Sequence, residues 1–144
     1  MGFGFPAALG AKVAKPDRPV FDIAGDGSFQ MTENSLATSI EEQIPVTVVI
    51  LNNRMLGMVA QWQRHFYNRR YSGVKLGKSP DFVKLAESYG AEGVRVETIP
   101  ELESAVNRAI SSPVTTVIDV PISPEENVLP MLPPGAGLKE MIIG

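Results

Sequence analysis

The chain has 144 residues, which is about the length of one domain, and its 44% hydrophobic and 20% charged residues are typical of a globular fold. With 13 Lys and Arg against 16 Asp and Glu, the net charge of −3 gives no basic field for nucleic acid or an anionic membrane. Zero cysteines exclude disulfides and thiolate metal sites, and a single histidine, His65, excludes a multi-histidine zinc site. Because no apolar run approaches the roughly 18 residues of a spanning helix and the N-terminus lacks a secretory signal, we expect a cytoplasmic protein.

Apolar periodicity and chain-breaking residues predict an alternation of helices and strands. Pro45 ends an amphipathic helix before residues 46–51, whose apolar, β-branched side chains are typical of a strand covered on both faces. Ser79 as N-cap and Pro80 in the first turn predict a later helix that Gly90 ends. In chain order, we expect a helix over 3–14, a strand over 19–24, a helix over 32–42, a strand over 46–51, a helix over 57–67, a polar loop over 68–79, a helix over 79–90, a strand over 94–96, a helix over 100–111 and a strand over 114–120.

This order predicts an α/β fold, built on a parallel sheet with helices on both faces. Five prolines beyond residue 120 predict a mostly irregular tail, with a turn of helix over 137–142. Because the first expected element is a helix, we expect that the first strand of the domain is missing and that the chain begins inside a domain.

Two motifs near the N-terminus are weak. Residues 2–7 match G-x-G-x-x-A with Asp22 downstream, but a dinucleotide fingerprint requires a strand immediately before its glycines. Asp22, Asp26 and Glu33 have the spacing of EF-hand positions 1, 5 and 12, but Ala24 stands at position 3 and the preceding residues predict a strand. We therefore expect neither a nicotinamide site nor a calcium site here.

A third pattern is stronger. The strand over 19–24 runs into Gly25-Asp26-Gly27-Ser28, and the strand over 46–51 runs into Asn52-Asn53. In an open parallel sheet, ligands bind beyond the carboxyl ends of the strands. A carboxylate and an amide oxygen, completed by carbonyl, water and phosphate oxygens, suit Mg²⁺, and the glycines allow backbone N–H groups to approach a phosphate. These residues predict a magnesium–diphosphate site; the alternative is an Asp-Gly turn and an Asn pair that caps a loop.

The two-part pattern of Gly25-Asp26-Gly27-Ser28 and Asn52-Asn53 resembles the diphosphate motif of thiamine-diphosphate enzymes. Residues 1–11, 57–63 and 124–131 resemble the C-terminal third of the acetolactate synthase (acetohydroxyacid synthase) catalytic subunit, and the likeness covers essentially all 144 residues. The resemblance implies a thiamine-diphosphate- and Mg²⁺-binding domain of the diphosphate type over 1–121. It also implies a C-terminal tail over 122–144 that closes over the active site.

The resemblance also implies roles for single residues. Mg²⁺ would be bound by the side chains of Asp26 and Asn53 and by the backbone carbonyl of Met55. Met1 matches an apolar residue that wedges under the cofactor, and Met58 and Trp62 match residues near the substrate pocket, although ordinary helix packing is the alternative for these last two. The implied cofactor-binding residues are Met1, Gly25, Asp26, Gly27, Ser28, Asn53, Met55 and Gly57.

The implied reaction is carboligation in branched-chain (isoleucine and valine) amino-acid biosynthesis: pyruvate is decarboxylated and its hydroxyethyl unit is transferred to pyruvate or 2-oxobutyrate. In this family a glutamate on a separate pyrimidine-binding domain activates the cofactor, and no stretch of this chain resembles that domain. We therefore expect no catalytic residue in this chain and no turnover by the chain alone. FAD of the full enzyme would be bound mostly elsewhere. The expected partners are further copies of the chain in a homo-oligomer or a chain that carries the pyrimidine domain. A regulatory subunit is a further partner that the resemblance allows.

Two other functions stay open. One is a split-subunit thiamine-diphosphate 2-keto-acid decarboxylase, which Gln61-Trp62 and residues 124–131 disfavour. The other is a non-catalytic cofactor-binding or assembly module, which the presence of both Mg²⁺ ligands disfavours. The chain is about a quarter of the usual subunit of this family, so we expect either a truncated piece of it or one chain of a split enzyme.

Overall fold

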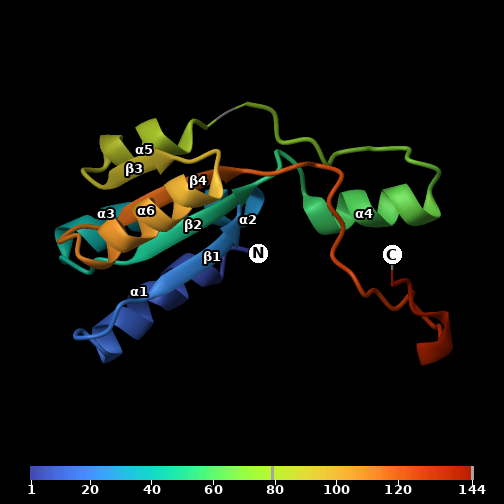
Figure 1. Ribbon diagram of the computed structural model, residues 1–144, viewed down its shortest axis with the longest axis horizontal. Helices are drawn as coiled ribbons and strands as arrows, with labels where there is room; N and C mark the ends of the chain where they lie inside the picture. The colour runs from blue at the N-terminus through green and yellow to red at the C-terminus, as the bar shows by residue number, and fades with distance from the viewer. Residues whose placement is uncertain (79, 144) are drawn as a thin grey trace.

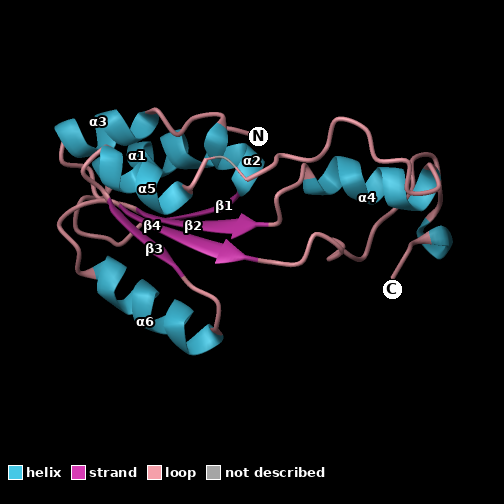
Figure 2. Ribbon diagram, turned by 90° about the horizontal axis from the view of Figure 1, so that it is seen from above, coloured by secondary structure: helices cyan, strands magenta, loops and turns pink. Residues whose placement is uncertain are grey.

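The computed structural model describes residues 1–78 and 80–143 and contains a four-stranded parallel sheet (Figures 1 and 2). The strand order is β1-β2-β4-β3, with β1 at Phe21–Gly25, β2 at Thr47–Asn52, β3 at Glu92–Arg95 and β4 at Thr116–Pro121. Because every neighbouring pair is parallel, all four carboxyl ends lie at the same edge of the sheet.

Helices cover both faces of this sheet, which confirms the fold class that the sequence predicts. Figure 2 shows α1, α2, α3 and α5 on one face and α6 on the other, whereas α4 stands beyond the carboxyl ends of the strands, beside the C-terminal tail. Within the described ranges, no helix combines the length and the apolar character that a membrane-spanning segment needs. The helices are α1 Gly4–Ala14, α2 Asp26–Gln30, α3 Ser35–Glu41, α4 Gly57–Phe66, α5 Phe82–Ser88 and α6 Ile99–Ile110, with a 3₁₀ turn at Leu138–Glu140.

Apolar side chains form one core cluster on each face of the sheet. The larger cluster packs α1, α2, α3 and α5 against the strands, and the smaller one packs α6 against them. β2 lies in the middle, and its first four residues are buried on both faces. β1 is an edge strand with alternating burial, and on the α6 face its Phe21 and Ile23 are 39% and 63% exposed. This face of β1 is therefore left open.

The structure corrects the predicted start of the helix over 32–42. That helix is α3, which begins only at Ser35, and a separate short helix, α2, begins at Asp26 directly after β1. Phe29 explains the extra helix, because its ring packs against the rings of Phe5 and Phe82 at centroid distances of 5.3 and 5.9 Å. This aromatic contact anchors α2 to the core and so fixes the residues that precede Phe29.

The start of α5 is also corrected: the helix begins at Phe82 and not near Pro80. Asp81 is its N-cap, and its Oδ1 accepts hydrogen bonds from the backbone N–H groups of Val83 (3.1 Å) and Lys84 (3.4 Å). Ser79, the predicted N-cap, lies outside the described residues. The remaining elements agree with the sequence-based bounds to within two residues.

Gly93 allows α5 to pack closely on β3. A Cβ atom at this position would lie 2.6 Å from the carbonyl oxygen of Val83 and 2.8 Å from its Cα. Both are backbone atoms, so neither can rotate away from an added methyl group. Gly10 of α1 differs, since a Cβ there would have no neighbour within 4 Å.

We expect Gly93→Ala to lower the free energy of unfolding by about 1–3 kcal/mol, because α5 must shift away from β3 to admit the methyl group. Gly10→Ala is the matched control and should raise this free energy by up to about 1 kcal/mol, because alanine favours the helix over glycine. Urea unfolding followed by circular dichroism measures both changes. Equal stability of the two variants would contradict the tight contact at Gly93.

Asp22 is a buried carboxylate on the α1 side of β1. Its side chain is 6% exposed, and its Oδ2 has no hydrogen-bond partner among the described residues. A Cβ on Gly4 would collide with its Oδ1, so α1 passes directly over the carboxyl group. Burial raises the pKa of Asp22 above its ordinary value.

A raised pKa means that the folded chain binds the Asp22 proton more tightly than the unfolded chain does. The stability that this tighter proton binding contributes to the folded chain is fully present below about pH 4. It is lost as the pH rises through the folded-state pKa of Asp22. We therefore expect Asp22→Asn to gain stability relative to the parent chain as the pH rises from about 4 to 7, by about 1.4 kcal/mol for each unit of raised pKa. Urea unfolding at several pH values measures the difference, with Asp17→Asn, at a side chain that is 78% exposed, as the control. A difference that did not change with pH would refute this account of Asp22.

Candidate cofactor site

A cavity of about 310 Å³ lies beyond the carboxyl ends of β1 and β2. Its walls come from the N-terminal segment, the start of α2, the loop that follows β2 and the start of α4. The sequence did not predict its apolar wall, which includes Ile23, Leu51, Leu56, Val59 and Ile122. The cavity brings together all residues that the sequence assigned to the cofactor, which are Met1, Gly25, Asp26, Gly27, Ser28, Asn53, Met55 and Gly57. Their roles in binding stay predictions.

Asp26 is the acidic residue of this cavity. It is 2% exposed, its Oδ1 accepts a hydrogen bond from the backbone N–H of Gly27 (3.0 Å), and its Oδ2 is buried with no partner among the described residues. Burial raises the pKa of Asp26, while the backbone N–H groups of Gly27 and Arg54 and the positive charge of Arg54 oppose the rise. Such a carboxylate needs a cation or a proton to offset the cost of its burial.

The loop after β2 supplies neutral oxygens to the same cavity. Asn53 is half-buried, and its Oδ1 accepts a hydrogen bond from the backbone N–H of Met55 (2.9 Å). Arg54 between them has φ +58, in the left-handed region, which turns the chain sharply at this point. One carboxylate, one amide oxygen and a backbone carbonyl are hard oxygen donors of the kind that Mg²⁺ takes together with phosphate and water. The unpartnered oxygen of Asp26 and this donor set therefore fit a magnesium ion.

Gly27, in the first turn of α2, lies against the loop that follows β2 and against the segment at Leu76. A Cβ at Gly27 would be 2.9 Å from Leu56 Cδ2, 3.0 Å from Leu76 Cδ1 and 3.4 Å from Met1 Cε, so a larger residue would displace these side chains. The hydroxyl of the neighbouring Ser28 accepts a hydrogen bond from the backbone N–H of Gly2 (3.0 Å). Ser28 thereby holds the N-terminal segment, and Met1 with it, against the start of α2.

A third buried carboxylate, Asp119, which the sequence pattern does not predict, holds the end of β2. Asp119 of β4 is fully buried, and its Oδ1 accepts a hydrogen bond from Asn52 Nδ2 (2.8 Å). Its Oδ2 accepts from Arg95 Nε and forms an ion pair with Arg95 Nη2, both at 2.9 Å. The first asparagine of the Asn52-Asn53 pair thus binds to the sheet, and the second is left to face the cavity.

The two residues assigned to the substrate pocket lie on α4. Met58 lines both the cofactor cavity and an adjoining apolar hollow of about 370 Å³, and Trp62 lines only this second hollow. Met58 is 50% and Trp62 39% exposed, and the ring of Trp62 meets that of Phe66 edge-to-face at 5.9 Å. The structure therefore places Trp62 beside the cofactor cavity and not in its wall.

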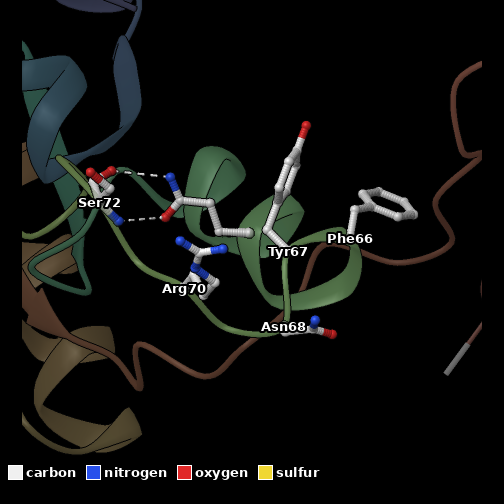
Figure 3. Close-up of a pocket in the computed structure, with 6 residues that line it drawn as sticks. Phe66, Tyr67, Asn68, Arg70 and Ser72 are labelled. Atoms are coloured by element: carbon white, nitrogen blue, oxygen red, sulfur yellow. Dashed lines mark hydrogen bonds between the residues drawn. The ribbon is translucent and has the colours of Figure 1, made fainter.

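The end of α4 and the following loop enclose a third hollow, of about 510 Å³. Figure 3 shows the rings of Phe66 and Tyr67 and the guanidinium of Arg70 around it. Two hydrogen bonds of 3.0 Å, from Gln63 Nε2 to Ser72 O and from Ser72 N to Gln63 Oε1, hold the loop to the helix. The chain beyond α4 is therefore folded back along this helix.

The opposite side of α4 is bonded to the C-terminal tail. Gln61 is 2% exposed, its Oε1 accepts from the backbone N–H of Val128 (2.7 Å), and its Nε2 donates to the Val128 carbonyl (3.0 Å). Arg64 donates to the carbonyls of Pro124 (2.8 Å) and Glu125 (3.0 Å) and also bonds to the Asn127 side chain. The tail thus closes against α4, the helix that borders the cavity.

Comparisons with known proteins agree with this geometry. Residues 1–120 match the protein family described as "Thiamine pyrophosphate enzyme, C-terminal TPP binding domain". The chain is 51% identical over 142 residues to the "Probable acetolactate synthase large subunit" of Methanocaldococcus jannaschii and 46% identical over 144 residues to the "Acetolactate synthase large subunit" of Haemophilus influenzae. These matches cover 99% of this chain and 24% and 25% of the relatives, so the chain spans about a quarter of their length.

A solved structure is similar as well. The Rhodococcus jostii RHA1 thiamine diphosphate-dependent 4-hydroxybenzoylformate decarboxylase superposes with a TM-score of 0.79 at 35% identity, over 85% of this chain and 23% of that one. The family match, the parallel sheet and the polar residues at its carboxyl edge lead to one assignment. The chain belongs to the family of C-terminal thiamine-pyrophosphate-binding domains of thiamine pyrophosphate enzymes.

Proposed function

We propose that this chain supplies the diphosphate and Mg²⁺ half of a thiamine-diphosphate-dependent acetolactate synthase. The reaction decarboxylates pyruvate and transfers the hydroxyethyl unit to pyruvate or 2-oxobutyrate, in branched-chain amino-acid biosynthesis. The observation that carries the proposal is the buried, unpartnered Asp26 Oδ2, in one cavity with Asn53 and Met55. The 43–51% identity to acetolactate synthase subunits over nearly the whole chain supports the choice of reaction.

In this proposal each residue of the cavity edge has a separate task. Asp26, Asn53 and the Met55 carbonyl bind Mg²⁺, which anchors the diphosphate of the cofactor. Gly25, Gly27 and Gly57 leave room for the diphosphate, and the backbone N–H groups of Gly27 and Ser28 donate to its oxygens. When bound, the cofactor supplies the electron sink for decarboxylation.

Apolar residues around the cavity bind the cofactor and the substrate in this proposal. Met1 supports the cofactor from below, and Met58 and Trp62 contact the alkyl group of the keto acid.

The glutamate that activates the cofactor is assigned to a partner domain. Asp26 is the one acid that lines the cavity within residues 1–78 and 80–143, and it is assigned to the metal. The activating glutamate therefore comes from a partner domain of the pyrimidine-binding type, which also covers the exposed Met1 and Phe3 at 71% and 79% exposure. FAD of the complete enzyme is held mostly outside residues 1–121, and residues 122–144 form the closing tail.

A thiamine-diphosphate-dependent 2-keto-acid decarboxylase is the second candidate. It is favoured by the structural similarity to the 4-hydroxybenzoylformate decarboxylase at 35% identity. The two candidates share the metal and diphosphate site and differ in what accepts the two-carbon unit: a second keto acid in one case and a proton in the other. Residues on α4 and in the tail, outside the shared sheet, decide between them.

We expect Asp26→Asn to weaken Mg²⁺-dependent binding of thiamine diphosphate by more than about tenfold, because the one charged oxygen donor is lost. The variant should fold at least as stably as the parent chain, since burial disfavours the ionised Asp26. Calorimetric titration with thiamine diphosphate, with and without Mg²⁺, measures the affinity. Asp17→Asn, at a side chain 78% exposed, is the control. Parent-like affinity in Asp26→Asn would remove Asp26 from the site.

A chimeric enzyme distinguishes the two candidate reactions. We expect residues 1–144 to support acetolactate formation from pyruvate when they replace the matching C-terminal segment of the M. jannaschii relative, to which they are 51% identical. The product is measured by its conversion to acetoin, and free aldehyde is measured in parallel. Aldehyde as the main product would favour the decarboxylase instead.

A further inference from the structure

A short segment far along the chain is paired with the loop that carries the candidate metal ligands. We call residues 74–76 the strap. The backbone N–H of Leu76 donates to the carbonyl of Arg54 (3.0 Å), and the backbone N–H of Leu56 donates to the carbonyl of Val74 (2.8 Å). These two bonds flank an antiparallel bridge between Met55 and Lys75. The sequence predicts only a polar loop here, yet Val74 is 1% exposed.

The strap determines the direction of the Met55 carbonyl. In an antiparallel pair, residues whose neighbours bond across to the other strand turn their own N–H and C=O groups to the opposite side. Arg54 and Leu56 bond to the strap, so the N–H and C=O of Met55 face away from it. The hydrogen bond from Met55 N to Asn53 Oδ1 (2.9 Å) lies on that side, and both residues line the cavity. The strap therefore aims the Met55 carbonyl toward the site.

The side chain of Leu76 joins this loop to the start of α2. Its Cδ1 lies 3.0 Å from the Cβ position of Gly27, next to Leu56 Cδ2 at 2.9 Å. Leu76 thus contacts the residue that follows Asp26, while its backbone holds the loop of Asn53 and Met55. The side chain of Lys75 between them is exposed.

Arg54 fastens the same loop on another side. Its Nη1 donates to the carbonyl of Pro80 (3.2 Å), and its guanidinium lies 5.7 Å from the ring centroid of Phe82. Phe82 in turn packs edge-on against Phe29 of α2. The loop is therefore fixed from two directions, by the strap and by the contacts of Arg54. The strap reaches the Gly27 position through Leu76, beside the loop's own Leu56.

We propose that Leu76 is a positioning residue for the cation site: through Gly27 and the strap it sets the spacing between the Asp26 carboxylate and the oxygens of Asn53 and Met55. This inference rests on the proposed function. Mg²⁺ requires near-octahedral ligands at about 2.0–2.1 Å, whereas Ca²⁺ accepts irregular sets at about 2.3–2.6 Å. A loosened spacing therefore weakens Mg²⁺ binding much more than Ca²⁺ binding.

The test measures Mg²⁺ and Ca²⁺ affinities of the 144-residue chain by calorimetry at a fixed, saturating concentration of thiamine diphosphate. We expect Leu76→Ala to weaken Mg²⁺ binding about tenfold or more, as removal of an outer contact of a metal site does, and Ca²⁺ binding by less than about threefold. Leu76→Met, which restores an apolar side chain of similar length, should recover most of the Mg²⁺ affinity. Lys75→Ala is the matched control on the same strap and should leave both affinities unchanged.

Leu76→Val repeats the measurement with a smaller loss of side-chain volume. The urea unfolding midpoint of each variant shows whether it is folded under the conditions of the titration. If the Leu76 variants bind Mg²⁺ and Ca²⁺ more weakly by the same factor, Leu76 has a general packing role and the inference is overturned. Parent-like Mg²⁺ affinity in these variants would also overturn it. Either result leaves the proposed function intact if the parent chain binds Mg²⁺ with thiamine diphosphate. If the parent chain binds neither ion under these conditions, the proposed function fails and the inference fails with it.

Discussion

The parallel pairing of β1 with β2 is the constraint on which the candidate site depends. Its register sets Gly25 opposite Leu51, so both strands end at the same level of the same edge. Asp26 and Asn53 then follow within two residues of those ends, although 26 residues separate them in the chain. A slip of one residue would turn every side chain of a strand to the other face. The buried alternation of Asp22 and Ala24 on the α1 side of β1 prevents that slip.

Two carboxylates are buried near this edge, and their hydrogen bonds separate their roles. Asp119 accepts from Asn52 on one oxygen and from Arg95 on the other, so its charge is compensated inside the protein. Asp26 is buried to a similar degree but has one oxygen without a partner. Asp22 also has a buried oxygen without a partner, but it lies under α1 and does not line the cavity, whereas Asp26 does. The contrast between Asp119 and Asp26, together with the position of Asp26 in the cavity, supports the proposal that a cation binds at Asp26.

The sequence predicts well those features that depend on local pattern. The apolar run of β2, the Pro45 stop and the apolar periodicity of α6 are local signals of the elements, and the two polar motifs at strand ends identify the cavity. It fails where contacts between distant residues decide the structure. α2 exists because Phe29 reaches Phe5 and Phe82, and Val74 is buried because the strap pairs with a loop about 20 residues earlier. Neither contact leaves a periodic pattern in the chain.

Two segments that are far apart in the chain and carry the resemblance to acetolactate synthase lie against each other in the structure. Residues 57–63 and 124–131 are joined by the paired hydrogen bonds between Gln61 and Val128, and Arg64 adds bonds to the carbonyls of Pro124 and Glu125. Since Gln61 is 2% exposed, moving the Val128 backbone away would leave the buried amide of Gln61 without these two hydrogen bonds. These bonds hold α4 in the position in which Met58 lines the cavity. The tail therefore contributes to the wall of the cavity in two ways, directly through Ile122 and indirectly through its bonds to α4.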